Sequence, residues 1–336
     1  VDPNFSTIDH VENMKVFLKE RKPGQPFSFW VSPTEPHRPF LRNVGVNSGE
    51  IDMAKLQVPP FLPDEPATRN DVADYLYEIQ WFDKELGRVL QLLAEQGELD
   101  NTVIVYTSDN GMAFPRAKGN NYEYGTHVPF AVRWGAATPG GQQVTDFISL
   151  TDLAPTFLAL AGIPVPPAMT GRSFREQLLA GRSGRIDKQR NAAYSGFERH
   201  IVDARLENRG YPSRAIHTDK HLFIQNLAPD RWPAGRPPGL FDIDDGSPSK
   251  NTLVQQKDKY ETFWELAAGK RPAEELYAVP DDPAQLHNLA ADPEYHSLKA
   301  SLAQRLYAEM QRTGDPWASG QGTIFDSYIY HSKDRE

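Results

Sequence analysis

The chain contains no cysteine among its 336 residues. This absence excludes disulfide bonds, zinc sites built on thiolates and catalysis by a cysteine of this chain. No run approaches the roughly 18–20 consecutive apolar residues of a membrane-spanning helix, and the first residues lack a signal-peptide pattern. Basic residues are outnumbered by acidic ones, 36 against 45. We therefore expect neither a membrane nor nucleic acid as a partner, because nucleic-acid binding depends on a cationic surface.

What is present describes a folded globular chain, with 39% hydrophobic and 11% aromatic residues. This composition excludes disordered and fibrous classes. A chain of this length exceeds the usual size of one domain. The pattern of predicted secondary structure changes near residue 185, where short strands separated by turn residues begin. We therefore predict two domains, over residues 1–185 and 186–336.

The first predicted domain alternates strands with helices. The strongest pattern is a helix over residues 69–97, whose apolar stripe includes Val72 and Leu93, with charged residues such as Asp74 and Glu78 placed elsewhere around it. The other predicted elements are the end of a helix near 11–18, a buried strand over 26–32, a long loop over 33–70, strands over 102–107 and 129–134, and a helix near 150–162. This alternation predicts an α/β domain with a mainly parallel sheet sandwiched by helices.

The second predicted domain is smaller and of the α+β kind. Strand patterns occur at 192–195, 213–217, 221–225 and 275–279. A terminal helix is predicted over 293–312, with Leu298, Leu302, Leu306 and Met310 on one face. We therefore expect a sheet of antiparallel strands with a helix laid across it.

The most informative short motif is Asp109-Asn110-Gly111, directly after the strand predicted over 102–107. Ligands of α/β sheets gather beyond the carboxyl ends of strands. A carboxylate beside an amide carbonyl offers hard oxygen donors, which suit Ca²⁺ or Mg²⁺. The alternative is an ordinary Asp-Asn-Gly turn, which is the commoner meaning of three such residues alone.

Two further side chains stand near this motif in the predicted topology. Lys118 lies eight residues beyond Asn110 and could share an anion with a bound cation, although a solvated surface lysine is the simpler interpretation. His37 follows the strand predicted over 26–32 and lies between two Pro residues, Pro36 and Pro39. A histidine there can donate a proton to a leaving group, or can simply be hydrogen-bonded within its loop.

Taken in order and spacing, these motifs resemble the latter two-thirds of a type I sulfatase, in the alkaline-phosphatase-like superfamily. The run from Tyr77 to Gly111 is similar to the long helix, strand and metal-binding turn of that family, and it continues through Lys118 to the segment YEYGTHVPFAVRWG. Within the family, the likeness is to N-sulfoglucosamine sulfohydrolases and their bacterial relatives. The segments that suggest this are Pro36-His37-Arg38, residues 58–64 and residues 197–201.

The resemblance implies roles for individual residues. Asp109 and Asn110 would ligate Ca²⁺, with Mg²⁺ the less favoured cation. Lys118 would bind sulfate oxygens, and His37 would contact the sulfate and protonate the departing atom. A catalytic formylglycine would come from a Cys/Ser-x-Pro-x-Arg motif. Glu198, Arg199 and His200 are the candidate substrate contacts.

This chain departs from the family pattern because it contains neither a cysteine nor a Ser-x-Pro-x-Arg motif. We therefore expect a companion amino-terminal segment of the same enzyme to carry the formylglycine, and we expect the chain alone to be inactive. The implied substrate is a sulfated saccharide, which favours an exported protein. Two alternatives remain: a phosphodiesterase or phosphonate hydrolase of the same superfamily, and a non-catalytic relative that binds anions or glycans. The hydrolase interpretation requires Asp109, Lys118 and His37 to converge on one tetrahedral anion.

Overall fold

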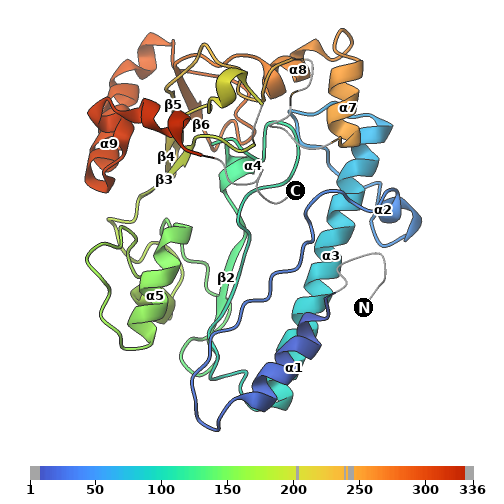
Figure 1. Ribbon diagram of the computed structural model, residues 1–336, viewed down its shortest axis with the longest axis vertical. Coiled ribbons are helices and arrows are strands. Elements are labelled where there is room, and N and C mark those ends of the chain that lie inside the picture. Colours follow the sequence, from blue (N-terminus) through green and yellow to red (C-terminus); the bar gives the residue numbers. More distant parts are fainter. Residues whose placement is uncertain (1–7, 202–203, 238–239, 241–245, 330–336) are drawn as a thin grey trace.

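The computed structural model describes residues 8–201, 204–237, 240 and 246–329 (Figure 1). Its α-helices are α1 (His10–Glu20), α2 (Val44–Asn47), α3 (Pro66–Glu95), α4 (Glu123–Thr126), α5 (Leu153–Leu160), α6 (Arg175–Leu179), α7 (Pro248–Gln255), α8 (Glu261–Ala268) and α9 (His296–Thr313). Its strands are β1 (Ile104–Thr107), β2 (Phe130–Arg133), β3 (Ala192–Phe197), β4 (Ser213–Thr218), β5 (His221–Asn226) and β6 (Glu274–Ala278). Within these ranges, none of the helices is both long enough and apolar enough to cross a bilayer.

Helix α3 is the longest element and confirms the helix predicted over 69–97. It begins three residues earlier, because Pro66 occupies its first turn and the Glu65 side chain accepts a hydrogen bond from the Thr68 amide at 3.2 Å. Its carboxy-terminal half packs against α1 through buried Val89, Leu92 and Leu93. The two helices run side by side along one flank of the molecule (Figure 1).

The strands of the first region correct the predicted parallel sheet. β1 and β2 are present, but they pair antiparallel, with Ile104 opposite Arg133 and Thr107 opposite Phe130. The connection over residues 108–129 contains only the four-residue helix α4, which is too short for the crossover that a parallel pair needs. An apolar run indicates burial but carries no information on strand direction, which is why the sequence did not reveal the pairing.

The strand predicted over 26–32 is not paired in the described structure. Its side chains alternate as in a half-buried strand: Phe27, Phe29 and Val31 pack against the α1–α3 core, while the residues between them are exposed. Among the described residues, no backbone hydrogen bond joins this segment to a neighbouring strand. The segment predicted as a buried strand is therefore extended and buried on one side only, and it has no ladder partner among the described residues.

The carboxy-terminal α+β region agrees with the prediction. Its four strands form an antiparallel sheet in the order β3-β4-β5-β6. One face packs against α9 through Ile216, Phe223 and Leu306, and the opposite face carries Ala215 and Leu222 beside Tyr122. The same sheet therefore contacts the helix that follows it and a loop from the first half of the chain.

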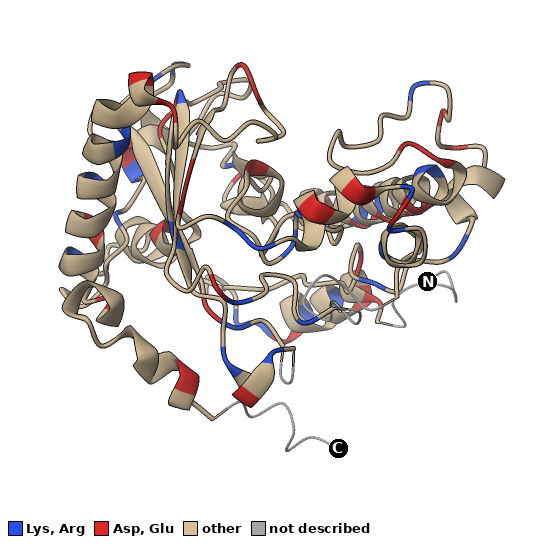
Figure 2. Ribbon diagram, turned by 90° about the horizontal axis from the view of Figure 1, so that it is seen from above, with Lys and Arg blue, Asp and Glu red and all other residues tan. Residues whose placement is uncertain are grey.

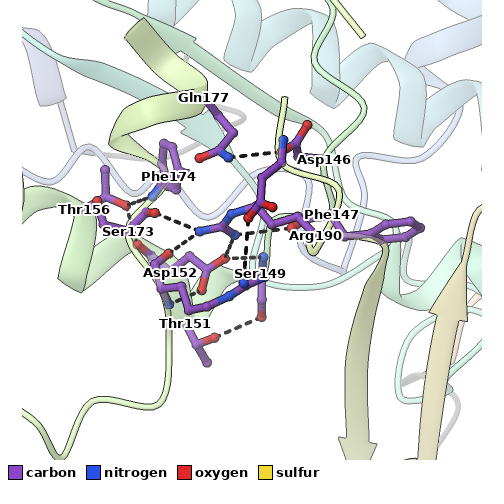
Figure 3. A network of polar contacts seen from close by, with 12 residues as sticks. Asp146, Phe147, Ser149, Thr151, Asp152, Thr156, Ser173, Phe174, Gln177 and Arg190 are labelled. Carbon is purple, nitrogen blue, oxygen red and sulfur yellow. Dashed lines mark hydrogen bonds and ion pairs between the residues drawn. The ribbon is translucent and has the colours of Figure 1, made fainter. Parts of the chain in front are cut away.

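The two halves of the chain share a hydrophobic core. Phe61, Phe114 and Val72 pack in one cluster with Leu253 and Trp264. A separate polar network centred on Arg190 fastens the segment that carries α5 and α6 (Figure 3). The domain boundary at residue 185 stays a prediction. Figure 2 shows basic and acidic positions interleaved along the helices.

Candidate active site

The Asp109-Asn110-Gly111 turn lies directly beyond β1, as expected. The Asn110 side-chain nitrogen donates to the Gly111 carbonyl at 2.8 Å, which leaves its amide oxygen available as a ligand. Asp109 is exposed, and its carboxylate has no hydrogen bond or ion pair within the described residues. A side chain at position 111 would collide with the Tyr124 carbonyl, 1.9 Å from an added Cβ. The Asp109 carboxylate and the Asn110 amide oxygen are thus donors that suit a hard cation. The close approach of Gly111 shows that the turn is packed tightly against α4.

Lys118 belongs to the same compact loop. Its backbone amide donates to the Met112 carbonyl at 3.1 Å, two residues beyond Asn110. Gly125 closes the loop from the other side, because a Cβ there would lie 2.4 Å from the Ala117 carbonyl. The half-buried Lys118 ammonium has no ion pair among the residues that the structure describes. The backbone thus holds Lys118 close to the acid–amide turn while leaving its charge uncompensated.

His37 is exposed, and its loop is attached to this same stretch of chain. Its Nδ1 lies 2.6 Å from the Arg38 carbonyl oxygen, so Nδ1 must be the protonated nitrogen and Nε2 is the atom left for other contacts. The Arg38 Nε donates to the Ala113 carbonyl at 2.7 Å. The structure therefore brings the segments of His37, Lys118 and Asp109 into direct contact.

Three acidic residues of α3 bind the His37 loop through an ion pair and hydrogen bonds. Asp71 pairs with the Arg38 guanidinium, Asp74 accepts from the Asn43 and Gly45 amides, and Glu78 accepts from the Leu41 amide at 3.1 Å. Their spacing along the helix places them on one face. All three are buried, at 2–4% exposure. Asp74 and Glu78 lie outside the apolar stripe, as expected, but they form a second buried face of the helix, which was not predicted.

Burial of the carboxylates on this face of α3 disfavours their ionised forms. Burial raises the pKa of Glu78 to about 7, and the neighbouring carboxylates of Glu35 and Asp74 add to the shift, against the hydrogen bond from Leu41 and the charge of Arg38. The pKa of Asp74 is raised for the same first reason. The sequence offered one signal for this arrangement: acidic residues recurring at helical spacing inside an otherwise buried helix.

A second group that sequence reasoning missed fastens α4 to the carboxy-terminal sheet. The Glu123 carboxylate lies 3.1 Å from His217 Nδ1 on β4 and 3.0 Å from His127 Nδ1, and His217 Nε2 lies 3.1 Å from the Ser195 hydroxyl on β3. Burial raises the pKa of Glu123, but the hydrogen bonds with the two histidines outweigh it and lower the pKa to about 2. The ionised carboxylate thus links the end of the Lys118 loop to the sheet.

A large hollow of about 1550 Å³ lies beside these groups. It is lined by Asp109, by Glu123 and His127 of the α4 segment, by residues 128–135 around β2, and by residues 193–195 of β3. Lys118 and His37 are not among its lining residues. Their convergence with Asp109 on one anion therefore stays a prediction, although their supporting segments touch.

The candidate substrate contacts already make internal interactions. The Glu198 carboxylate pairs with Arg214 and accepts from the Trp317 indole at 2.9 Å, and burial raises the pKa of Glu198. Arg199 donates to the carbonyls of Asn208 and Tyr328 at 2.8 and 2.7 Å. His200 is half-buried in the same segment. Their role in binding substrate stays a prediction.

Comparison with known proteins finds similarity to sulfatases. A family model described as Sulfatase matches residues 3–163, and a second, described as N-sulphoglucosamine sulphohydrolase, C-terminal, matches residues 117–233. The chain is 26% identical to an ulvan-active sulfatase of Formosa agariphila, covering 91% of this chain and 55% of that protein. It is 27% identical to human N-sulphoglucosamine sulphohydrolase, covering 91% of this chain and 64% of the relative.

The fold is likewise shared with a solved sulfatase. The structure of BT4656 in complex with D-glucosamine-2-N,6-O-disulfate superimposes with a TM-score of 0.62 at 19% identity, covering 91% of this chain and 69% of that one. The α/β class with its antiparallel carboxy-terminal sheet is thereby confirmed, as is the resemblance found in the motifs. The chain spans less than two thirds of the length of the two curated relatives named above. These matches show that the chain is similar to sulfatases over most of its length.

Proposed function

We propose that this chain forms part of a sulfatase that hydrolyses a sulfate ester or an N-sulfate of a sulfated saccharide. The observation that carries the proposal is the contact between three segments. Arg38 joins the His37 loop to Ala113, and Lys118 is joined to Met112, immediately after the Asp109-Asn110 pair. A proton donor, a cation and an acid–amide pair on touching segments are the groups that sulfuryl transfer requires, since charge on the sulfuryl oxygens and on the leaving group must both be offset.

Asp109 and Asn110 would hold the divalent cation. Their oxygen donors favour Ca²⁺, and Mg²⁺, which demands strict octahedral geometry, is the second candidate. Within the described ranges, no group of three or more His, Cys, Asp or Glu side chains could hold a metal ion. Two donors are fewer than the roughly six to eight oxygen ligands of Ca²⁺, so the site would need further oxygen ligands besides Asp109 and Asn110. When bound, the cation would supply positive charge to the sulfuryl oxygens.

Lys118 and His37 would act on the two ends of the scissile bond. The Lys118 ammonium would bind a sulfuryl oxygen, because its charge has no partner among the described residues. His37 would act in its doubly protonated form. Its Nδ1–H donates to the Arg38 carbonyl, and its Nε2–H would face the departing oxygen or nitrogen and transfer its proton there, which leaves the ring neutral. These assignments use groups on loops that the buried core holds in place.

The nucleophile would come from a companion segment, meaning a stretch of the same enzyme outside this sequence that carries formylglycine. Three features support a missing neighbour: the extended residues 26–32, which have no strand partner among the described residues; Trp30, which is 79% exposed; and exposed Leu150 and Phe157, just before and within α5. An unpaired strand and exposed apolar side chains are an aggregation hazard unless they are covered. A companion segment would pair and cover them.

The substrate would be a sulfated glycan, with Glu198, Arg199 and His200 as candidate contacts. Such glycans lie outside cells or in lysosomes, so we infer an exported protein. The proposal covers both N-sulfate and O-sulfate. Substrates for both bonds therefore belong in the test.

The test uses the full reading frame that contains this chain. The purified protein should release sulfate from N-sulfoglucosamine or a glucosamine O-sulfate, and from 4-nitrophenyl sulfate, but should not hydrolyse bis(4-nitrophenyl) phosphate. Removal of calcium should abolish release, and Ca²⁺ should restore it better than Mg²⁺. Diester hydrolysis without sulfate release would favour the phosphodiesterase alternative. Heparin binding with no hydrolysis would favour the non-catalytic one.

A matched lysine pair tests the site within the same assay. Lys118→Ala should lower kcat/KM by about 100-fold or more, the usual cost of removing a group that stabilises transition-state charge. Lys188→Ala, at an exposed position of the 182–190 segment, should leave it within about twofold. Equal effects of the two substitutions would refute the role of Lys118.

A further inference from the structure

Arg38 directly follows His37, yet its side chain runs into the protein rather than to the surface. Only 7% of this side chain is exposed. The guanidinium lies over two aromatic rings, 4.1 Å from the centroid of Phe40 and 4.7 Å from that of Phe114. Its Nε donates to the Ala113 carbonyl at 2.7 Å. One planar group thus contacts both its own loop and the loop that carries Lys118.

The two terminal nitrogens of Arg38 are bound by a single carboxylate. Asp71 of α3 accepts both of them in a forked pair, at 2.8 and 2.9 Å. The same carboxylate also accepts from the Ser249 hydroxyl at 2.6 Å, at the start of α7. Arg38 is therefore anchored through Asp71 to a helix of the first half and a helix of the second half of the chain.

The backbone of the same residue orients the imidazole. The Arg38 carbonyl oxygen lies 2.6 Å from His37 Nδ1. Because the side chain of Arg38 is fixed at three points, its backbone has little freedom, and the direction of the His37 ring is fixed with it. The chain of contacts runs from Ser249 through Asp71 and Arg38 to His37.

We propose that Arg38, held by Asp71 and Ser249, is a positioning residue that aims His37 at the departing atom and sets its place relative to the Lys118 loop. This role deepens the proposed function and rests on it. Arginine is needed because its planar guanidinium can donate two hydrogen bonds to the Asp71 carboxylate and a third to the Ala113 carbonyl at the same time. A lysine keeps the charge but cannot make these contacts together.

Leaving-group dependence separates positioning from a general effect on folding. A nitrophenolate departs without a proton, whereas the amine or alkoxide of a sugar needs one from His37. Arg38→Lys should therefore lower kcat for N-sulfoglucosamine by about 100-fold, within the range of general acid catalysis. The same variant should lower kcat for 4-nitrophenyl sulfate by less than about fivefold, with KM little changed for both. Loss of folded enzyme would lower both values equally.

The structure provides a matched control in Arg190. It is also buried: one terminal nitrogen donates to Asp152 at 2.8 Å and the other to the carbonyls of Arg172 and Ser173 at 2.8 Å, in the network of Figure 3. Arg190→Lys removes a comparable set of buried guanidinium contacts, none of them to His37, so any loss should be the same for both substrates. A leaving-group effect of similar size in this control would overturn the proposal.

Ser249→Ala keeps the proposal testable if Arg38→Lys fails to fold. It removes a single hydroxyl contact with Asp71, and we expect a smaller loss, about threefold to tenfold, again confined to the sugar substrate. Equal losses for the two leaving groups in the folded variants would overturn the role of Arg38. A wild-type enzyme that releases sulfate from neither substrate would instead overturn the proposed function, and this role with it.

Discussion

Glu78 should destabilise the protein at alkaline pH, and Glu78→Gln should relieve this. The carboxylate is 3% exposed, and burial raises its pKa from 4.5 to about 7. Between these two values the folded state holds a proton that the unfolded state has lost, so stability falls as pH rises through that window. The interval of about 2.5 pH units corresponds to about 3 kcal/mol at 1.36 kcal/mol per unit.

Glutamine removes the charge and keeps the local shape. Its amide oxygen can still accept from the Leu41 amide, which Glu78 accepts at 3.1 Å, and its nitrogen replaces the Oε2 atom for which the described residues offer no hydrogen-bond partner. We therefore expect the variant to be more stable than the wild type by about 1–3 kcal/mol at pH 8. At pH 4.5 the wild-type group is protonated in the folded state, and the difference should shrink towards zero.

Urea unfolding at pH 4.5, 6, 7 and 8, followed by both tryptophan fluorescence and circular dichroism, measures this difference. Coincident transitions would justify two-state free energies. Glu95→Gln is the control, since Glu95 is exposed at the end of the same helix and its removal should change stability by less than about 0.5 kcal/mol at every pH. A Glu78→Gln variant that is less stable at pH 8, or whose advantage does not depend on pH, would refute the reasoning.

Three further predictions concern Glu123, the proposed calcium site and Trp30. Glu123→Gln should lower the free energy of unfolding by at most about 3 kcal/mol near pH 7, because burial raises the pKa of Glu123 while His127 and His217 hold it at about 2. That loss should be fully present above pH 4.5 and should fade as pH falls towards 2, measured as the difference between variant and wild type in urea. Calcium should raise the melting temperature of the full protein but not that of its Asp109→Ala variant, measured by calorimetry. Acrylamide should quench Trp30 in the isolated chain, as judged against Trp30→Phe, and association with the companion segment should protect it.

Periodic patterns predicted most of the secondary structure. The helix over 69–97 and the four strands of the carboxy-terminal sheet were found because long apolar stripes and short runs between turn residues are local features. The Asp109 turn and the loops of Lys118 and His37 were found by motif. Their contacts through Arg38 and Met112 became visible only in three dimensions.

The errors share a cause, which is that they concern partners distant in sequence. The direction of β1 relative to β2 depends on the path of residues 108–129, which an apolar run does not encode. The burial of the acidic face of α3 was not predicted, because isolated carboxylates are rarely buried. Asp74 and Glu78 are buried because the backbone amides of residues 41–45 need acceptors, and that requirement belongs to another segment of the chain.

The attachment of α4 to the carboxy-terminal sheet bears on how such proteins can diversify. The Tyr122 hydroxyl donates to Glu275 on β6 at 2.8 Å, while Glu123 is bound to His217 on β4. Exchanging this sheet for that of a relative would leave Tyr122 and Glu123 without these partners and would loosen the loop that carries Lys118. A functional chimera must therefore import residues 116–127 together with the sheet, so its crossover point belongs before Arg116 rather than at the predicted domain boundary near 185.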